Sequence, residues 1–221
     1  MLTGAPADNI EVVEFAEAGS VMDMARSAGA FTTRRVDDFK PVTTEELNHP
    51  DAADWLNWRR TPDGHAHSPL VDISRDNVSR LSMTWSMAMH QGSNQPTPLV
   101  RDGIMFLTHA HNKIQAIEAA TGELIWEYQY EFPPASKMLG GPTRNIALWQ
   151  DRLFLTTYDA AIVAIDATTG FELWRTEKAD YRDAFTHSAG PIMANGIVVS
   201  GINGCELFTQ DGCFITGHDP E

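Results

Sequence analysis

The chain has 221 residues, of which 43% are hydrophobic and 21% charged, a composition typical of a globular protein with a sizeable core. Sixteen basic residues against 30 acidic residues give a net charge of −14, which disfavours binding to nucleic acid and to anionic lipid surfaces. No apolar run is long enough to cross a membrane, and no secretory signal is visible at the start of the sequence.

Residues 1–42 are predicted to be an acidic extension ahead of the main domain. The first 54 residues carry 4 basic and 11 acidic side chains, which is half of the excess negative charge. One weak amphipathic helix is expected over residues 10–28, and little else. A short helix is expected directly after Thr43, because a threonine N-cap is followed by acidic side chains, among them Glu46, in the first turn.

An internal repeat organises the rest of the chain. Segment 116–126 recurs 48 residues later as segment 164–174, and a third copy begins at Thr216. Each copy is preceded by two apolar strands that meet at a turn, and the Asp-Gly and Asn-Gly dipeptides found there tolerate the positive φ of a tight hairpin. Strand–turn–strand units are expected at 98–108, 146–156 and 191–200, single strands at 82–89, 113–118 and 161–166, and a further strand after each Thr-Gly.

Repeated groups of three or four short antiparallel strands in fewer than 50 residues are typical of β-propeller blades. A helical solenoid is excluded because the segments lack a period of 3.6 residues. Trp126 and Trp174 end their repeats, and we expect them to lie between neighbouring blades. The predicted fold class is therefore all-β, a partial β-propeller of about three to four blades over residues 43–221.

Two cysteines, Cys205 and Cys213, lie in one glycine-rich stretch. Their spacing alone allows either a disulfide, which would indicate an oxidising compartment, or two small and partly buried side chains. A zinc site is not expected, because only His218 lies close by and a tetrahedral site needs four ligands. Four histidines show no ligand spacing and are interpreted as polar loop residues: His109, His111, His187 and His218.

The repeat, Ala-x-Asp-x-x-Thr-Gly-x-x-x-Trp, resembles the pyrroloquinoline quinone (PQQ) repeat of quinoprotein dehydrogenases. The segment that leads into it, with Trp55, Ser68-Pro69-Leu70 and Asn77-Val78, is similar to the start of the PQQ-dependent alcohol and methanol dehydrogenases. This resemblance covers residues 43–221 and implies the first part of an eight-bladed propeller with PQQ and Ca²⁺ on its axis. Similar repeats occur in cofactor-free propellers, so a protein-binding scaffold is the alternative function.

The resemblance implies a set of cofactor-binding residues. Gln95 stands where the family often has Glu, and it keeps a hydrogen-bond acceptor. Arg144 matches an arginine that pairs with a PQQ carboxylate, for which a planar guanidinium is suited. Glu206 matches a Ca²⁺ ligand, because a hard cation prefers carboxylate oxygen. The full set is Gln95, Arg144, Ser188, Asn203, Gly204, Cys205 and Glu206, with Glu206 as the metal ligand.

Each of these residues, taken alone, also has an ordinary structural explanation. Arg144 is equally a solvated loop cation, Ser188 a hydroxyl that satisfies the backbone at a strand end, and Glu206 a charge on an edge strand. The three together match the family at preserved spacings and at equivalent positions of successive blades. The combination therefore favours the cofactor site.

The sequence also departs from the resembled family. Methanol and ethanol dehydrogenases place two adjacent cysteines before the arginine, where this chain has Met138 and Leu139. Cys205 and Cys213 instead resemble a loop-closing pair from another branch of the family, and this resemblance favours a disulfide between them. The departure weakens any inference about the substrate.

The resemblance implies oxidation of a small alcohol to an aldehyde or ketone, with hydride transfer to PQQ and an aspartate as the base. It also implies a periplasmic location and an electron acceptor such as a cytochrome c or a quinone. A polymer or polyol oxidase of the same fold is a further possibility. The family's catalytic Asp is expected beyond Glu221, so no catalytic residue is assigned within 1–221 and the chain alone is expected to be inactive.

Overall fold

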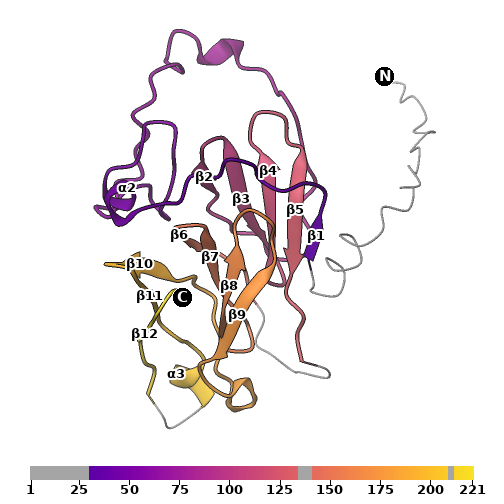
Figure 1. Ribbon diagram of the computed structural model, residues 1–221, viewed down its shortest axis with the longest axis vertical. Helices are drawn as coiled ribbons and strands as arrows, with labels where there is room; N and C mark the ends of the chain where they lie inside the picture. Colours follow the sequence, from indigo (N-terminus) through magenta and orange to yellow (C-terminus); the bar gives the residue numbers. More distant parts are fainter. Residues whose placement is uncertain (1–29, 134–140, 209–211) are drawn as a thin grey trace, which may run out of the picture.

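The computed structural model describes residues 30–133, 141–208 and 212–221. The helix expected over residues 10–28 lies outside this part. Three antiparallel sheets follow one another along the chain (Figure 1). Two of them contain a complete four-stranded meander, and the third has three strands, as the partial propeller predicts.

The first sheet has the order β1-β5-β4-β3-β2, the second β6-β7-β8-β9 and the third β10-β11-β12. The strands of the first sheet are β1 (Ala30–Thr32), β2 (Leu99–Arg101), β3 (Ile104–His109), β4 (Lys113–Glu118) and β5 (Leu124–Gln129). The others are β6 (Ala147–Trp149), β7 (Arg152–Thr156), β8 (Ala161–Asp166), β9 (Glu172–Glu177), β10 (Ile192–Ala194), β11 (Ile197–Ser200) and β12 (Thr216–His218). Short helical segments are α2 (Thr44–Asn48), η1 (Val78–Arg80), η2 (Tyr181–Asp183) and α3 (Cys205–Phe208).

The turns between paired strands have the backbone that the sequence predicts. Asp102 and Gly103 have φ values of 52° and 82°, and Asn195 and Gly196 have values of 49° and 77°. These left-handed conformations are the ones that Asp-Gly and Asn-Gly tolerate best. Each turn therefore fixes the register of its hairpin, for example Leu99 opposite Phe106 in the first sheet.

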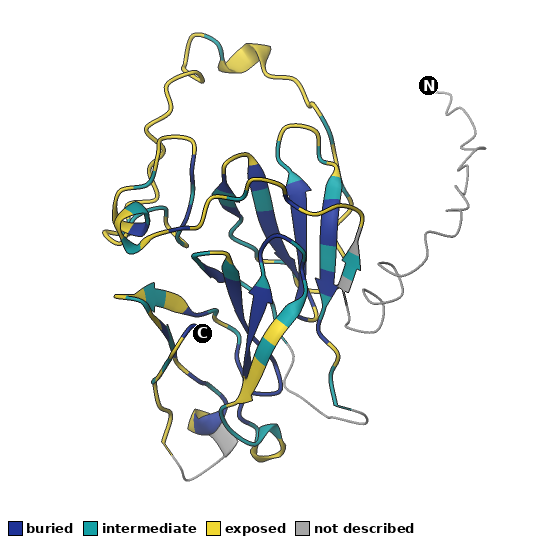
Figure 2. Ribbon diagram, viewed as in Figure 1, coloured by how far each residue is buried: buried dark blue, intermediate teal, exposed yellow. Residues whose placement is uncertain are grey.

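The repeat is visible in the details of the two complete blades. The register between β4 and β5 shifts between Ala116 and Ile117, and the register between β8 and β9 shifts between Ala164 and Ile165. These are the same positions of the 48-residue repeat. The inner strands of both blades are mostly buried (Figure 2), as expected for sheets that pack face to face around a common core.

A tryptophan from each unit docks onto the next unit. Trp126 is fully buried and donates a hydrogen bond from Nε1 to Ala167 O at 3.0 Å. Its ring lies where a Cβ on Gly170 would be, 2.6 Å from Cε3. The predicted position between blades is therefore confirmed, and only glycine fits the turn beneath the ring. Equivalent hydrogen bonds join Trp85 to Ala119 at 3.0 Å and Trp174 to Pro220 at 3.2 Å.

One predicted strand is wrong. Residues 82–89 have an extended sequence pattern but form no strand in the structure. The edges of the first sheet are formed by β2 and β1, and β1 occupies the edge beside β5. Residues 82–89 therefore have no strand partner in the described part of the chain, although Trp85 docks like its counterparts. They belong to a long and largely exposed arch that includes η1 (Figures 1 and 2).

Residues 30–42 contribute β1 to the first sheet and also contact the second sheet. β1 pairs with β5, and Val42 forms a bridge with Gln150. The boundary of the extension at residue 42 stays a prediction. The helix expected after Thr43 is confirmed as α2, and Thr43 and Glu46 form a reciprocal capping box. No helix in the described part of the chain is long and apolar enough to cross a membrane.

Candidate cofactor site

The predicted site residues lie at one end of the sheets. Gln95 precedes β2, Arg144 precedes β6, Ser188 precedes β10, and Asn203 follows β11. Because neighbouring strands are antiparallel, the start of the first strand and the end of the second strand of a blade lie at the same sheet end. The topology therefore brings residues from three sheets to a common edge.

Arg144 joins the segments that precede three sheets. Its Nε donates to Gln95 Oε1 at 3.1 Å, and its Nη1 donates to the backbone oxygen of Ser188 at 2.7 Å. The backbone oxygen of Arg144 accepts a hydrogen bond from Thr97 N at 2.9 Å. Within the described residues, no carboxylate forms an ion pair with this guanidinium. Arg144 is therefore a positioned cation that has neutral protein partners and can pair with an anionic ligand.

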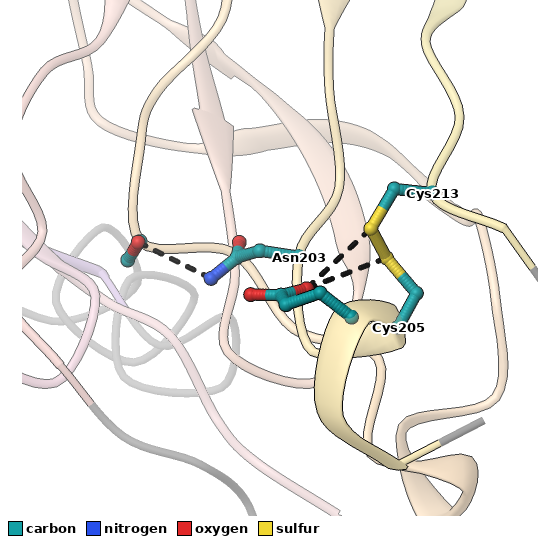
Figure 3. Close-up of a disulfide and its surroundings, with 5 residues drawn as sticks. Asn203, Cys205 and Cys213 are labelled. Atoms are coloured by element: carbon teal, nitrogen blue, oxygen red, sulfur yellow. Dashed lines mark hydrogen bonds between the residues drawn. A yellow bond between two sulfur atoms is a disulfide. The ribbon is translucent and has the colours of Figure 1, made fainter.

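Asn203 extends the same set of contacts into the third sheet. Its Nδ2 donates to Ser188 Oγ at 3.3 Å (Figure 3). Its backbone exchanges two hydrogen bonds with Thr186, at 2.9 and 3.0 Å. Gly204 follows with a φ of 94°, and a Cβ there would lie 1.9 Å from Ala184 O. Glycine is therefore required at this position by conformation and by space.

The metal-ligand candidate Glu206 lies on α3, beside a disulfide. Cys205 and Cys213 are bonded to each other, with their Cα atoms 5.4 Å apart (Figure 3). The Oε2 atom of Glu206 is 3.5 Å from one sulfur and 3.4 Å from the other. Disulfide sulfurs carry no proton, so these are packing contacts rather than hydrogen bonds. The disulfide removes both sulfurs from the possible ligands, so of these three residues only the exposed Glu206 carboxylate keeps the chemistry of a cation ligand.

A narrow cleft, which has no room for a molecule of the size of water, is lined by Arg144, His187 and Ser188, among others. Its walls are held by buried polar side chains that the sequence analysis did not identify. Asn112 makes two of these contacts: its Nδ2 donates to Thr143 Oγ1 at 3.1 Å, and its Oδ1 accepts a hydrogen bond from Tyr158 N at 2.9 Å. The sequence does contain a signal for these residues, because Asn and Thr recur at the ends of apolar strands, where their side chains form hydrogen bonds with loop backbone groups.

The interpretation of the histidines as polar loop residues is wrong for most of them. His109 ends β3 and is buried, with Nε2 2.7 Å from Gln115 Oε1. His218 lies in β12. His187 does lie in a linker but is 3% exposed, and its burial lowers its pKa to about 4. Of the four, only His111, which lies in an exposed turn, fits the interpretation. The others do not fit because strand ends beside a cleft bury polar side chains that a loop would expose.

Two positions of interest fall outside the described residues. Met138 and Leu139 replace the adjacent cysteines of the resembled family, and they belong to the undescribed segment 134–140.

The four-stranded blades with tryptophan docking define a β-propeller of the type built from PQQ repeats. Residues 55–173 match the sequence profile of the glucose/ethanol/alcohol dehydrogenase β-propeller domain. This match covers more than half of the chain, and the chain belongs to that family.

Similar proteins include alcohol dehydrogenases and a methanol dehydrogenase. The dehydrogenase subunit of the alcohol dehydrogenase (quinone) of Komagataeibacter europaeus is 30% identical over 206 residues, which cover 88% of this chain and 28% of that protein. The structure of quinohemoprotein alcohol dehydrogenase ADHIIG from Pseudomonas putida is similar with a TM-score of 0.73 and 29% identity, over 83% of this chain and 28% of that one. A europium-containing methanol dehydrogenase has a TM-score of 0.72 and 25% identity, over 80% and 32%. The chain therefore spans about a third or less of these relatives.

Proposed function

We propose that this chain supplies part of the cofactor site of a PQQ- and Ca²⁺-dependent alcohol dehydrogenase. The observation that carries the proposal is the position of Arg144, a cation held by Gln95 and Ser188 without a carboxylate partner among the described residues. PQQ is a planar quinone with three carboxylates, and it supplies the hydride acceptor for alcohol oxidation when it is bound. A positioned guanidinium fits such a ligand because its planar fork matches a carboxylate.

The other residues of the candidate site have separate roles in this proposal. Gln95 orients the guanidinium through Oε1 and keeps its amide N–H groups for a polar edge of the ligand. The Ser188 hydroxyl, which Asn203 contacts, offers a further hydrogen bond. Gly204 supports the site indirectly, because it lets its backbone pass close to Ala184 O, where a side chain would not fit.

Glu206 is proposed as a ligand of the metal ion. One carboxylate does not complete a Ca²⁺ site, which takes six to eight oxygen ligands. The remaining ligands and the aspartate that acts as the base have no counterpart assigned within residues 1–221. We therefore propose that the chain alone binds the cofactor without oxidising an alcohol. The disulfide supports a location in an oxidising compartment such as the periplasm, with a cytochrome c or a quinone as the electron acceptor.

Binding of PQQ to the purified chain in the presence of Ca²⁺ tests the proposal. Arg144→Ala is expected to raise the dissociation constant at least tenfold, because a charge-assisted hydrogen bond contributes about 1.5–3 kcal/mol. Arg80→Ala, at an exposed arginine of η1, is the matched control and is expected to leave binding unchanged. Equal binding by the wild type and Arg144→Ala would contradict the assignment. Absence of binding to the wild type would instead favour the cofactor-free scaffold.

An activity assay tests the second part of the proposal. The chain is mixed with PQQ, Ca²⁺, a primary alcohol and an artificial electron acceptor, and reduction of the acceptor is followed by absorbance. We expect no turnover that depends on the alcohol. Steady turnover would show that the missing base lies within the 221 residues.

A further inference from the structure

The linker that precedes β10 contains two residues, Thr186 and Ser188, that contact other residues of the proposed site. Within it, Thr186 exchanges two backbone hydrogen bonds with Asn203, and Ser188 accepts Arg144 Nη1 through its backbone oxygen. The residue between them is His187, which is almost fully buried and lines the same cleft as Arg144 and Ser188. A side chain that fixes His187 therefore also fixes the residues on both sides of it.

The contacts of His187 determine which ring nitrogen carries the proton. Nδ1 lies 3.0 Å from the backbone oxygen of Thr157, and a carbonyl oxygen only accepts, so Nδ1 is the donor. Burial lowers the pKa of His187 to about 4, although the Thr157 and Gly201 carbonyls oppose this shift, so the ring is neutral near pH 7. With its one proton on Nδ1, the neutral ring keeps a lone pair on Nε2. The atom 3.2 Å from Nε2 is Nζ of Lys178, which donates to it.

Lys178 lies directly after β9, and its ammonium group reaches the third sheet. Nζ donates to Ser200 Oγ at 2.6 Å and to the backbone oxygen of Gly201 at 2.9 Å, and it lies 3.2 Å from the backbone oxygen of Ser200. Within the described residues it forms no ion pair with a carboxylate. The Lys178 ammonium group, at the end of one blade, thus contacts the linker and the end of β11 through hydrogen bonds to neutral acceptors.

We propose that Lys178 is a positioning residue of the cofactor cleft, which acts through His187 to hold the linker that carries Ser188. Its three ammonium protons match the His187 nitrogen, the Ser200 hydroxyl and the Gly201 carbonyl. A neutral apolar side chain would leave Nε2 of His187 buried without a donor, which is costly. The ring would then change its tautomer or its orientation. The relevance to PQQ rests on the function proposed above, but the hydrogen-bond arrangement does not.

Nitrogen-15 NMR of the histidines in the unliganded 221-residue chain tests the arrangement directly. In the wild type, His187 is expected to be neutral near pH 7, with the proton on Nδ1. Lys178→Met is expected to shift the Nε2 resonance or to give a mixture of tautomers, and Lys178→Arg is expected to restore the wild-type pattern. Lys40→Met removes an exposed lysine paired with Asp102 and serves as the matched control.

Binding of PQQ with Ca²⁺ to the same variants tests the consequence for the cleft. We expect Lys178→Met to weaken binding at least fivefold and Lys178→Arg to restore it, while Lys40→Met has no effect. If Lys178→Met does not fold, Lys178→Leu, which also removes the donor to Nε2, is measured instead. An unchanged His187 spectrum in the neutral variant, or a proton on Nε2 in the wild type, overturns the proposal. Failure of the wild type to bind PQQ overturns only the proposed function.

Discussion

Acid should destabilise the fold through His187 in a measurable way. In the folded chain its burial lowers the pKa from the ordinary 6.5 to about 4. As the pH falls, the unfolded chain takes up this proton first, so folding loses stability between pH 6.5 and pH 4, and the loss is complete below pH 4. The difference in pKa corresponds to roughly 3 kcal/mol, a large part of the stability of an ordinary domain.

The assay is urea unfolding followed by tryptophan fluorescence at several values of pH. His187→Asn keeps an N–H that can donate to Thr157 but removes the titration, and His67→Asn changes an exposed histidine as the control. Between pH 6.5 and 4, the wild type and the control are expected to lose roughly 3 kcal/mol more than His187→Asn. If the free energy of unfolding fell with pH in the same way for all three proteins, His187 would not be a buried neutral histidine.

Three further predictions concern the blades and the loop of Glu206. Trp126→Ala should cost about 3–5 kcal/mol, measured by denaturant unfolding, because the ring is fully buried between two blades; a loss below 1 kcal/mol would argue against docking. Gly204→Ala should lower the melting temperature and abolish PQQ binding, because its Cβ would overlap Ala184 O; wild-type behaviour would show that the backbone can relax. Replacing Cys205 and Cys213 by serine should lower the free energy of unfolding by about 2–3 kcal/mol for a loop of this length. A reductant should lower the stability of the wild type but not that of this variant. If the reductant also destabilised the variant, it would be acting on something other than the disulfide.

The fold could be predicted in some detail because its signals are local and repeated. The turn at Asp102-Gly103, the strand 113–118 and the docking of Trp126 each follow from a pattern of a few residues that recurs at 48. Strand 82–89 was wrong for a different reason. Its alternation satisfies a local rule, but a strand also needs a partner edge, and which edges are free depends on the whole topology.

The sequence predicted which residues belong to the candidate site but not the hydrogen bonds between them. Arg144, Ser188 and Asn203 were identified from spacing and resemblance, and the structure brings them together with Gln95 through hydrogen bonds. His187 was misread as a polar loop residue, because burial of a linker side chain depends on a neighbouring blade and leaves no trace in spacing. Their roles in cofactor binding stay predictions.

The indole hydrogen bond that recurs from unit to unit has a direction. The unit of Trp85 holds the turn after β4, Trp126 holds the turn after β8, and Trp174 holds the carbonyl of Pro220. Each unit is thus anchored by its predecessor, and these links act in series, as in other repeat proteins. Breaking a middle link would divide the arc into two separately melting halves, whereas breaking a terminal link would fray only one end.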